Sequence, residues 1–219
     1  TAKNAMTNEV RQLIQTHREE LITLLRDRDG GRQEDPPAQR DTVETIKISA
    51  PGLVLRPWRL DDAAEVLPAL LEPAIALWNP PRPMVVDLKS AKTWLARRTD
   101  LSTGDHISLA VADPATGTLL GSVSLHSIRD GNASVGYWTV ESARKRGVAS
   151  RAVAAITEWG FLQRGLHRIE LCHAVANPGS CGVAERAGYQ LEGTLRESLR
   201  YGDGRRHDEH VHARLTSDS

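Results

Sequence analysis

Cysteines and aromatic residues are scarce in this 219-residue chain, and neither sign of charge is in excess. Its two cysteines, Cys172 and Cys181, are too few for a disulfide framework, and the apolar run around Cys172 is typical of a small core residue. The formal net charge of zero disfavours a dedicated nucleic-acid-binding protein, which normally carries a basic excess.

Export signals and long apolar runs are missing as well. The sequence contains no signal-peptide pattern, no lipidation motif and no apolar run of membrane-spanning length. We therefore expect a soluble, cytoplasmic protein that binds neither membranes nor nucleic acid. The 40% of hydrophobic residues is enough for a packed core, and the length suits one ordinary domain plus an extension.

Two familiar phosphate-binding loops are absent, namely the P-loop pattern G-x-x-x-x-G-K-[ST] and the dinucleotide pattern G-x-G-x-x-G. A different loop, 144–149, lies between a strand-like run at 134–140 and a helix-like run that begins at Val148. Small residues let a backbone approach a ligand, and a helix start presents unpaired amides to an anion. This order predicts a pyrophosphate site beside basic residues. By itself it also fits an ordinary helix start whose Gly147 only relieves crowding.

Two motifs together resemble those of the GNAT N-acetyltransferases. Segment 144–149 (RKRGVA) fits the acetyl-CoA loop pattern [RQ]-x-x-G-x-[GA], and segment 177–189 fits N-P-x-S-x-x-V-x-x-[RK]-x-G-[FY]. Segments 53–63, 191–195 and 212–215 are similar to the ribosomal-protein-alanine (RimJ/RimL-like) branch. The resemblance implies a GNAT domain over 51–219, acetyl-CoA as the donor and an amine as the acceptor. Residues 1–50 lie outside it as an N-terminal helical extension and linker.

The resemblance also implies which residues contact the cofactor. In the family, the strand before the loop splays from its neighbour and pairs with the pantetheine arm, and an Asn after the next strand bonds that arm. Trp138 equally suits a simple core strand, and Asn177-Pro178 equally suits a turn. The implied cofactor-binding residues are Trp138, Thr139, Val140, Arg144, Lys145, Arg146, Gly147, Val148, Ala149, Ser150, Asn177 and Ser180.

Ser180 is the first candidate for the chemistry. Acetyl transfer to an amine needs a neutral amine, a stabilised oxyanion and a proton for the leaving thiolate. The resemblance places a serine at Ser180 as that proton donor. The alternative is an N-cap serine for the helix that follows.

The general base is the point at which the sequence departs from the family. Several relatives carry Ala-Glu-[Ile/Leu]-Gly-Tyr, whereas this chain has Ser134 in place of the glutamate. His126 and His173 are candidate substitutes, because imidazole titrates near ~6.5. Whether His126 shares a face with Ser134 depends on the hairpin register. Alternatively, an acceptor of low pKa arrives already neutral, and an α-amine at ~8 comes nearer to this than a lysine at ~10.4.

Two further groups of residues have competing interpretations. Trp78 and Trp94 flank the two variable helices that usually wall the acceptor pocket, although core anchoring suits at least one of them. A cluster of His and acidic residues near the C-terminus suggests a metal ligand set, but its sequence offers no fourth ligand, and the resemblance implies no metal. That cluster comprises His207, Asp208, Glu209, His210 and His212.

The predicted fold is α+β, with a mixed, mostly antiparallel central sheet flanked by helices. The periodicity predicts strands at 53–58, 106–113, 118–128, 133–140, 168–175, 189–199 and 206–215. It predicts helices at 60–71, 87–98, 148–164 and 179–187, a loop at 72–86, and a weak edge strand at 42–48.

The extension predicts one further helix, from Thr7 to Arg28. Its apolar stripe must pack on another surface, because a lone helix of this length is marginal in water. A two-fold pair would bury both copies of the stripe, so we expect a homodimer. The stripe comprises Val10, Leu13, Ile14, Leu21, Leu24 and Leu25.

Two functions of different classes remain open. The first is an acyl-CoA-dependent N-acetyltransferase that acts on a protein N-terminus or on a small molecule such as an amino-acid derivative or antibiotic. The second is a GNAT-fold module that binds CoA or a partner protein with little turnover, and the missing glutamate at Ser134 favours it. The sequence does not name the acceptor or the acyl chain length.

Overall fold

The structure, a computed structural model, describes residues 46–79, 84–100 and 104–218. Residues Thr1–Arg40 form one unit and Asp41–Ser219 another. The predicted N-terminal helix and its apolar stripe lie outside the described residues. No helix among the described residues is both long and apolar enough to cross a membrane.

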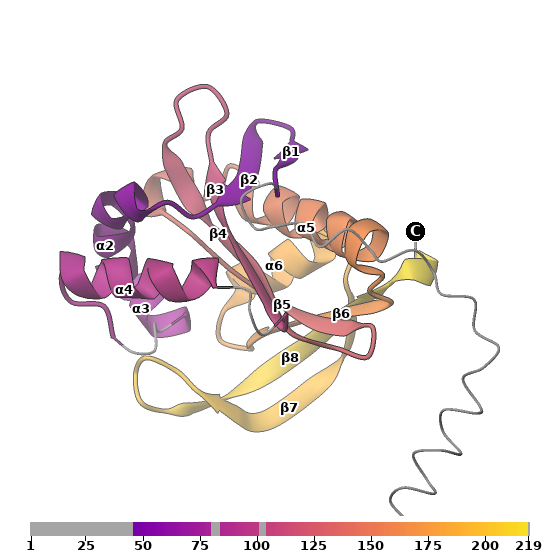
Figure 1. Cartoon of the computed structure of the whole chain (residues 1–219). Helices are drawn as coiled ribbons and strands as arrows, with labels where there is room; N and C mark the ends of the chain where they lie inside the picture. The colour runs from indigo at the N-terminus through magenta and orange to yellow at the C-terminus, as the bar shows by residue number, and fades with distance from the viewer. Residues whose placement is uncertain (1–45, 80–83, 101–103, 219) are drawn as a thin grey trace, which may run out of the picture. The chain divides into compact units, whose positions relative to one another are not determined.

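An eight-stranded sheet forms the centre of the domain, in the order β1-β2-β3-β4-β5-β6-β8-β7 (Figure 1). Among the described strands, the one parallel pair is β5 with β6, and the other neighbours are antiparallel. The mixed, mostly antiparallel sheet is the predicted one. The strands are β1 (Ile48–Ala50), β2 (Leu53–Pro57), β3 (His106–Ala112), β4 (Leu119–Arg129), β5 (Asn132–Thr139), β6 (Arg168–Ala174), β7 (Gln190–Arg200) and β8 (Arg206–Leu215).

Helices cover both faces of this sheet. In Figure 1, α2–α4 lie on one side of the strands and α5 and α6 on the other. The α-helices are α2 (Ala63–Leu71), α3 (Pro73–Trp78), α4 (Leu88–Thr99), α5 (Val148–Arg164) and α6 (Pro178–Arg186). Short 3₁₀ turns are η2 (Leu60–Asp62), η3 (Glu141–Ala143) and η4 (Thr216–Asp218).

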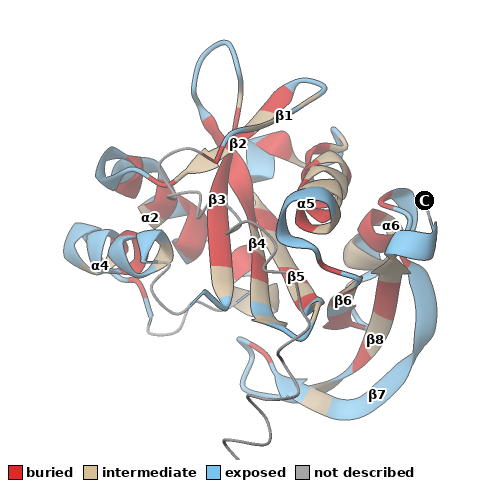
Figure 2. Cartoon of the chain, turned by 45° about the vertical axis from the view of Figure 1, so that its right-hand side comes forward, coloured by how far each residue is buried: buried red, intermediate tan, exposed pale blue. Residues whose placement is uncertain are grey.

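The core has two parts because successive strand residues point to opposite faces. In β3, Ile107, Leu109 and Val111 pack beneath α5, whereas Ala110 faces the layer of α2 and α4. Ser108, on that second face, is buried and accepts a hydrogen bond from Trp58 Nε1 at 3.1 Å. Figure 2 shows the buried run along β3 and β4 and the exposed length of β7.

Two boundaries differ from the sequence-based expectation. The weak edge strand predicted at 42–48 is displaced toward the end of the predicted linker: β1 is Ile48–Ala50 and pairs with β2, and Ile46 before it is buried in the core. The helix α3 occupies part of the predicted loop 72–86. Its six residues are too few for a periodic pattern, and its prolines suggested a break, yet Pro73 stands at the first helical turn, where proline is favourable.

Gly121 lets β4 and β5 approach closely. A Cβ at this position would lie 2.2 Å from the Trp138 carbonyl oxygen. We expect Gly121→Ala to lower the free energy of unfolding by about 1–3 kcal/mol, because the backbone must shift. Gly193→Ala in β7 is the matched control, since its Cβ would meet nothing within 4 Å. Urea unfolding measures both, and equal stability of the two variants would contradict the expectation.

Candidate active site

A cleft opens where β5 and β6 diverge. These parallel strands pair only through Asn132–Ser134 and Arg168–Glu170. Beyond this point, both strands continue without pairing to each other, and a cavity of about 800 Å³ lies between them. Its walls include Val135–Thr139 of β5 and Cys172–Ala174 of β6. The two strand edges that part here can pair with an extended ligand, as an added strand does, and the Tyr137 and Thr139 carbonyls of β5 already accept from the Asn79 and Arg144 side chains.

The predicted phosphate loop lines one part of this cleft. Gly147 is the N-cap of α5 and has φ 71°, and Lys145 has φ 57°, whereas Arg146 between them is not in the left-handed region. Such alternation turns successive amides toward one side and forms an anion-binding concavity. The first amides of α5 add donors and a favourable dipole. A Cβ on Gly147 would lie 3.0 Å from Arg151 Nη1, the end of a flexible side chain, so the left-handed φ is the stronger reason for glycine here. The arrangement fits a pyrophosphate.

Part of the predicted basic charge is already paired. Arg144 lines the cleft, but its guanidinium forms an ion pair with Glu72 and donates to the Thr139 carbonyl at 3.3 Å. Its first role here is to join the loop to the α2–α3 connection. Lys145 is exposed and lines the cleft.

Two other arginines differ from the sequence-based expectation. Arg146 does not line the cleft, and its Nη1 donates to the Ser142 carbonyl at 3.4 Å. Arg186, from the far end of α6, does line the cleft. The sequence reasoning missed it as a ligand contact, although it stands at the [RK] position of the second motif. The cleft therefore has cations on both of its walls.

At the other wall, the first turn of α6 presents Asn177 and Ser180. Asn177 is the N-cap of α6, and its Nδ2 donates to Ser180 Oγ at 3.1 Å. The N-cap alternative for Ser180 is therefore wrong, because this residue is the third of the helix. With Oγ accepting from Asn177, the hydroxyl proton of Ser180 is available to another acceptor.

Tyr137 is a cleft residue that the sequence reasoning did not single out. Burial raises the pKa of its phenol to about 12, and the nearby Ser180 side chain acts in the opposite direction. Its hydroxyl is buried and has no hydrogen-bond partner within the described ranges. An unsatisfied buried hydroxyl that lines a cleft is suited to bond a ligand. Its signal in the sequence was the family pattern Gly-Tyr, which was used only to place the missing glutamate.

The candidate bases fall in two different places. The register pairs His126 of β4 with Ser134 of β5, so these two do share a face. A Cβ on Gly136 would lie 3.5 Å from His126 Nε2. Burial lowers the pKa of His126, so the imidazole is neutral at pH 7 and able to accept a proton. Neither His126 nor Ser134 lines the cleft, whereas His173 does.

Of the three tryptophans proposed as site residues, two line the cleft and one lies in the core. Trp78 lines the cleft and packs edge-on against Tyr201, with ring centroids 5.7 Å apart. Trp94 does not line it: this residue is 4% exposed and packs edge-on against Trp58. Trp138 has both of its expected features, since it lines the cleft and its ring stacks on Trp58.

The remaining predicted cofactor-binding residues also divide into those that line the cleft and those that do not. Val148, Ala149 and Ser150 line the cleft at the start of α5. Val140 does not, because its amide donates to the Leu120 carbonyl at 3.0 Å and continues the sheet. The turn after β7 closes the cleft against α3, where the Gly202 amide donates to the Leu77 carbonyl at 2.9 Å.

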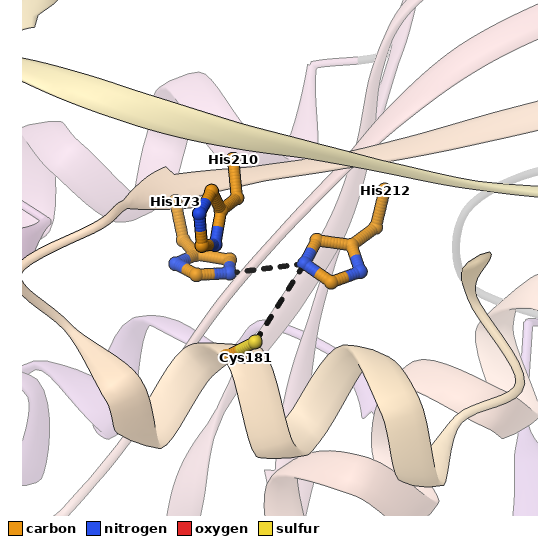
Figure 3. A group of neighbouring side chains, drawn as sticks. All are labelled: His173, Cys181, His210 and His212. Atoms are coloured by element: carbon orange, nitrogen blue, oxygen red, sulfur yellow. Dashed lines mark hydrogen bonds between the residues drawn. The ribbon is translucent and has the colours of Figure 1, made fainter. Parts of the chain in front are cut away.

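The C-terminal histidines do not act as one group. His207 bonds Asp203 at 2.9 Å, away from its neighbours in sequence. His210 and His212 instead lie beside His173 of β6 and Cys181 of α6 (Figure 3). The sequence reasoning found no fourth ligand because β6 and α6 bring theirs from distant segments.

A model of the GNAT acetyltransferase domain matches residues 52–190, which is more than half of the chain. This chain belongs to the GNAT acetyltransferase family. The match covers the cleft walls, the phosphate loop and the first turn of α6.

Named relatives lie in the same family. A putative ribosomal N-acetyltransferase of Bacillus subtilis is 35% identical over 94 residues, which are 42% of this chain and 51% of that protein. The ribosomal-protein-serine acetyltransferase of Escherichia coli is 35% identical over 82 residues, 36% of this chain and 46% of that one. This chain thus spans about half the length of these curated relatives.

Solved structures share the fold. Mycobacterium smegmatis RimJ, in complex with a CoA disulfide, is 23% identical with a TM-score of 0.71, over 79% of this chain and 87% of that one. RimL, a ribosomal L7/L12 acetyltransferase in complex with CoA, is 19% identical with a TM-score of 0.72, over 80% of this chain and 100% of that one. These likenesses support the GNAT fold of this family member.

Proposed function

We propose that this GNAT protein is an acyl-CoA-dependent N-acyltransferase that transfers an acetyl group from acetyl-CoA to a primary amine. The observation that carries this proposal is the cleft at the β5–β6 divergence, with the phosphate loop on one wall and Asn177 and Ser180 on the other. Acetyl-CoA would supply the acetyl group as a thioester, and its thiol would leave when the amine nitrogen bonds to the carbonyl carbon.

The residues of the cleft divide the work of holding this donor. The loop amides near Gly147, the dipole of α5 and Lys145 would bind the pyrophosphate. The edge of β5 that faces the cleft, where Asn79 Nδ2 donates to the Tyr137 carbonyl at 2.9 Å, and the side chain of Asn177 would hold the pantetheine arm. Arg186 supplies positive charge from the opposite wall.

Two hydroxyls are placed to supply a proton to the departing thiolate. We assign this role to Ser180, whose oxygen is already oriented by Asn177. Tyr137 lies close by and is the second candidate, because its raised pKa keeps the phenol protonated at neutral pH. Either group could act only in its protonated form.

For the acceptor, we propose a protein N-terminal α-amine in preference to a lysine side chain or a small-molecule amine. The reason is the lack of a carboxylate at Ser134: an α-amine, at ~8, loses its proton more readily than a lysine at ~10.4. His126, which faces Ser134, is the candidate to receive the proton. The printed names of two relatives refer to ribosomal substrates, which supports a protein acceptor. Trp78 and Tyr201 would wall the acceptor side.

A thiol-release assay tests this function against the second candidate, a CoA-binding module with little turnover. We expect release of free thiol from acetyl-CoA in the presence of peptides with free N-termini, and an acetylated product by mass spectrometry. A screen with several acyl-CoAs and with small amines would define donor and acceptor. Tight CoA binding without thiol release from any mixture would favour the binding module instead.

We further propose that the chain forms a homodimer through the N-terminal stripe. The described part offers a second apolar surface, since Leu191, Leu195 and Leu199 of the edge strand β7 are 46–55% exposed. We expect light scattering to give the mass of a dimer, and Leu21→Asp to give a monomer, because it would bury an unpaired charge. Leu162→Asp, at a 76% exposed position of α5, is the control. A monomeric intact chain would refute the dimer, and a dimeric Leu21→Asp variant would move the interface to the sheet.

A further inference from the structure

Four side chains that bind metals well meet between α6 and the sheet (Figure 3). We propose that His173, Cys181, His210 and His212 form a structural zinc site that holds α6 against β6 and β8. The site adjoins the cleft, which His173 also lines, but the proposed reaction does not require the metal.

The strand register produces the cluster. His173 of β6 pairs directly with His210 of β8, and His212 follows two residues later on the same face. This face is covered by α6, and Cys181 points from that helix toward the three rings, as Figure 3 shows. One ligand atom from each residue lies within 4.8 Å of the others.

The measured separations suit tetrahedral zinc. His173 Nε2 and His212 Nε2 are 3.2 Å apart, and Cys181 Sγ is 3.9 Å from His212 Nε2. Zn–N bonds of about 2.0 Å and Zn–S bonds of about 2.3 Å put neighbouring ligand atoms about 3.3–3.6 Å apart in a tetrahedron. The longest separation in the cluster, at most 4.8 Å, therefore needs to shorten by about 1 Å, which rotation of the partly exposed Cys181 and His210 side chains can supply, whereas His173 and His212 are buried.

The protonation of His173 leaves a free electron pair pointing into the cluster. Its Nδ1 lies 2.9 Å from the Ala174 carbonyl, which can only accept, so Nδ1 carries the proton of the neutral ring. Nε2 then carries no proton, and its electron pair, which can bind a metal or accept a hydrogen bond, is directed at His212. A ligating histidine whose other nitrogen donates to a backbone carbonyl is the usual arrangement at metal sites.

Two ring nitrogens of the cluster are buried without a hydrogen-bond partner among the described residues, and a zinc ion held by His212 Nε2 would leave Nδ1 of that ring unpaired. Nδ1 of His210 and Nδ1 of His212 are buried with no hydrogen-bond partner in the described part of the chain. The Nε2 atoms of His173 and His212 lie 3.2 Å apart, so at least one of them lacks a proton, and an unprotonated imidazole nitrogen is the form that binds metals.

Cys181 is the ligand that changes protonation. Its Sγ donates to Glu185 Oε1 at 3.7 Å, so the sulfur carries its proton in the absence of a cation. On binding, the S–H bond is replaced by a Zn–S bond, and the proton leaves to solvent. Four protein ligands close the coordination sphere, which is typical of a structural rather than a catalytic site. Because Cys181 follows Ser180, zinc would fix the helical turn that carries Asn177 and Ser180.

Cobalt(II) substitution tests the site in the full-length, untagged chain. We expect the metal-free protein to bind about one equivalent of cobalt, with a thiolate-to-cobalt absorption band and the visible bands of a tetrahedral ion, and zinc to displace it. Cys181→Ser should remove the thiolate band, and His212→Gln should weaken zinc binding at least about tenfold.

Matched controls come from the same strands. Cys172→Ser removes the other thiol of the chain, which lies on β6 next to His173. His207→Gln removes a histidine of β8 that bonds Asp203 and not the cluster. Both should keep the cobalt spectrum. Absence of the thiolate band from the unaltered chain, or its persistence in Cys181→Ser, would overturn the zinc site. CoA binding by the metal-free protein is measured separately by calorimetry. Failure of the zinc test would therefore leave the acyltransferase proposal standing, and failure of CoA binding would leave the zinc site standing.

Discussion

Gly147→Glu is expected to weaken CoA binding at least about 100-fold, or about 2.7 kcal/mol. Gly147 stands at the start of α5 with φ 71°, where the loop amides face the cleft. A glutamate there would place a side chain beside the loop amides and a negative charge against the pyrophosphate. Isothermal titration calorimetry with CoA measures the change.

Two comparison variants separate charge from backbone strain. In Gly147→Ala, the alanine must adopt the left-handed conformation but adds no charge. This backbone conformation costs the folded loop about 1 kcal/mol. Gly117→Glu adds the same side chain at φ 75° in the β3–β4 turn, where a Cβ would meet nothing within 4 Å. We expect it to bind CoA normally. A folded Gly147→Glu variant with unchanged CoA affinity would remove the basis for placing the pyrophosphate at this loop.

Ser180→Ala is expected to lower kcat about 100-fold and to change CoA affinity little. A proton donor to the leaving thiolate acts late in the reaction, so its loss affects turnover more than binding. The structure sharpens this expectation, because Ser180 is not the helix cap whose removal would unfold the first turn of α6. Steady-state kinetics and CoA calorimetry on the same preparation give the two quantities.

Tyr137→Phe is the comparison that distinguishes the two hydroxyls of the cleft. It removes the buried hydroxyl and keeps the ring. If Ser180→Ala stays within about twofold of the unaltered chain, a difference of only ~0.4 kcal/mol, while Tyr137→Phe loses activity, then Tyr137 is the donor. If both retain activity, neither hydroxyl donates the proton and the thiolate leaves unassisted.

Much of the fold followed from local patterns in the sequence. The seven strands from Leu53 onward, and helices α2, α4, α5 and α6, lie within a few residues of their predicted bounds, because alternation and helical spacing reflect which face of each element is buried. The loop at 144–149 was also predictable as a turn between a strand and a helix, since the three are consecutive in the chain. What local patterns missed was α3, which is too short to show a period.

The candidate site was predictable only in part, for a different physical reason. Sequence placed Ser180, Asn177 and the loop near one ligand, but it could not say that His126 faces Ser134, because a one-residue change of register would reverse the side-chain direction. Nor could it assign Trp94 to the core and Trp78 to the cleft, since both are large and flank similar helices.

By itself, the sequence determined the order of the elements, the family resemblance and the position of the phosphate loop, because each depends on residues that are neighbours in the chain. Tertiary structure alone decided where β5 and β6 part to form the cleft. It also brought His173 and Cys181 to the histidines of β8 and bound Arg144 to Glu72. These contacts join segments far apart in sequence, and they exist only once strand order and register set which side chains share a face.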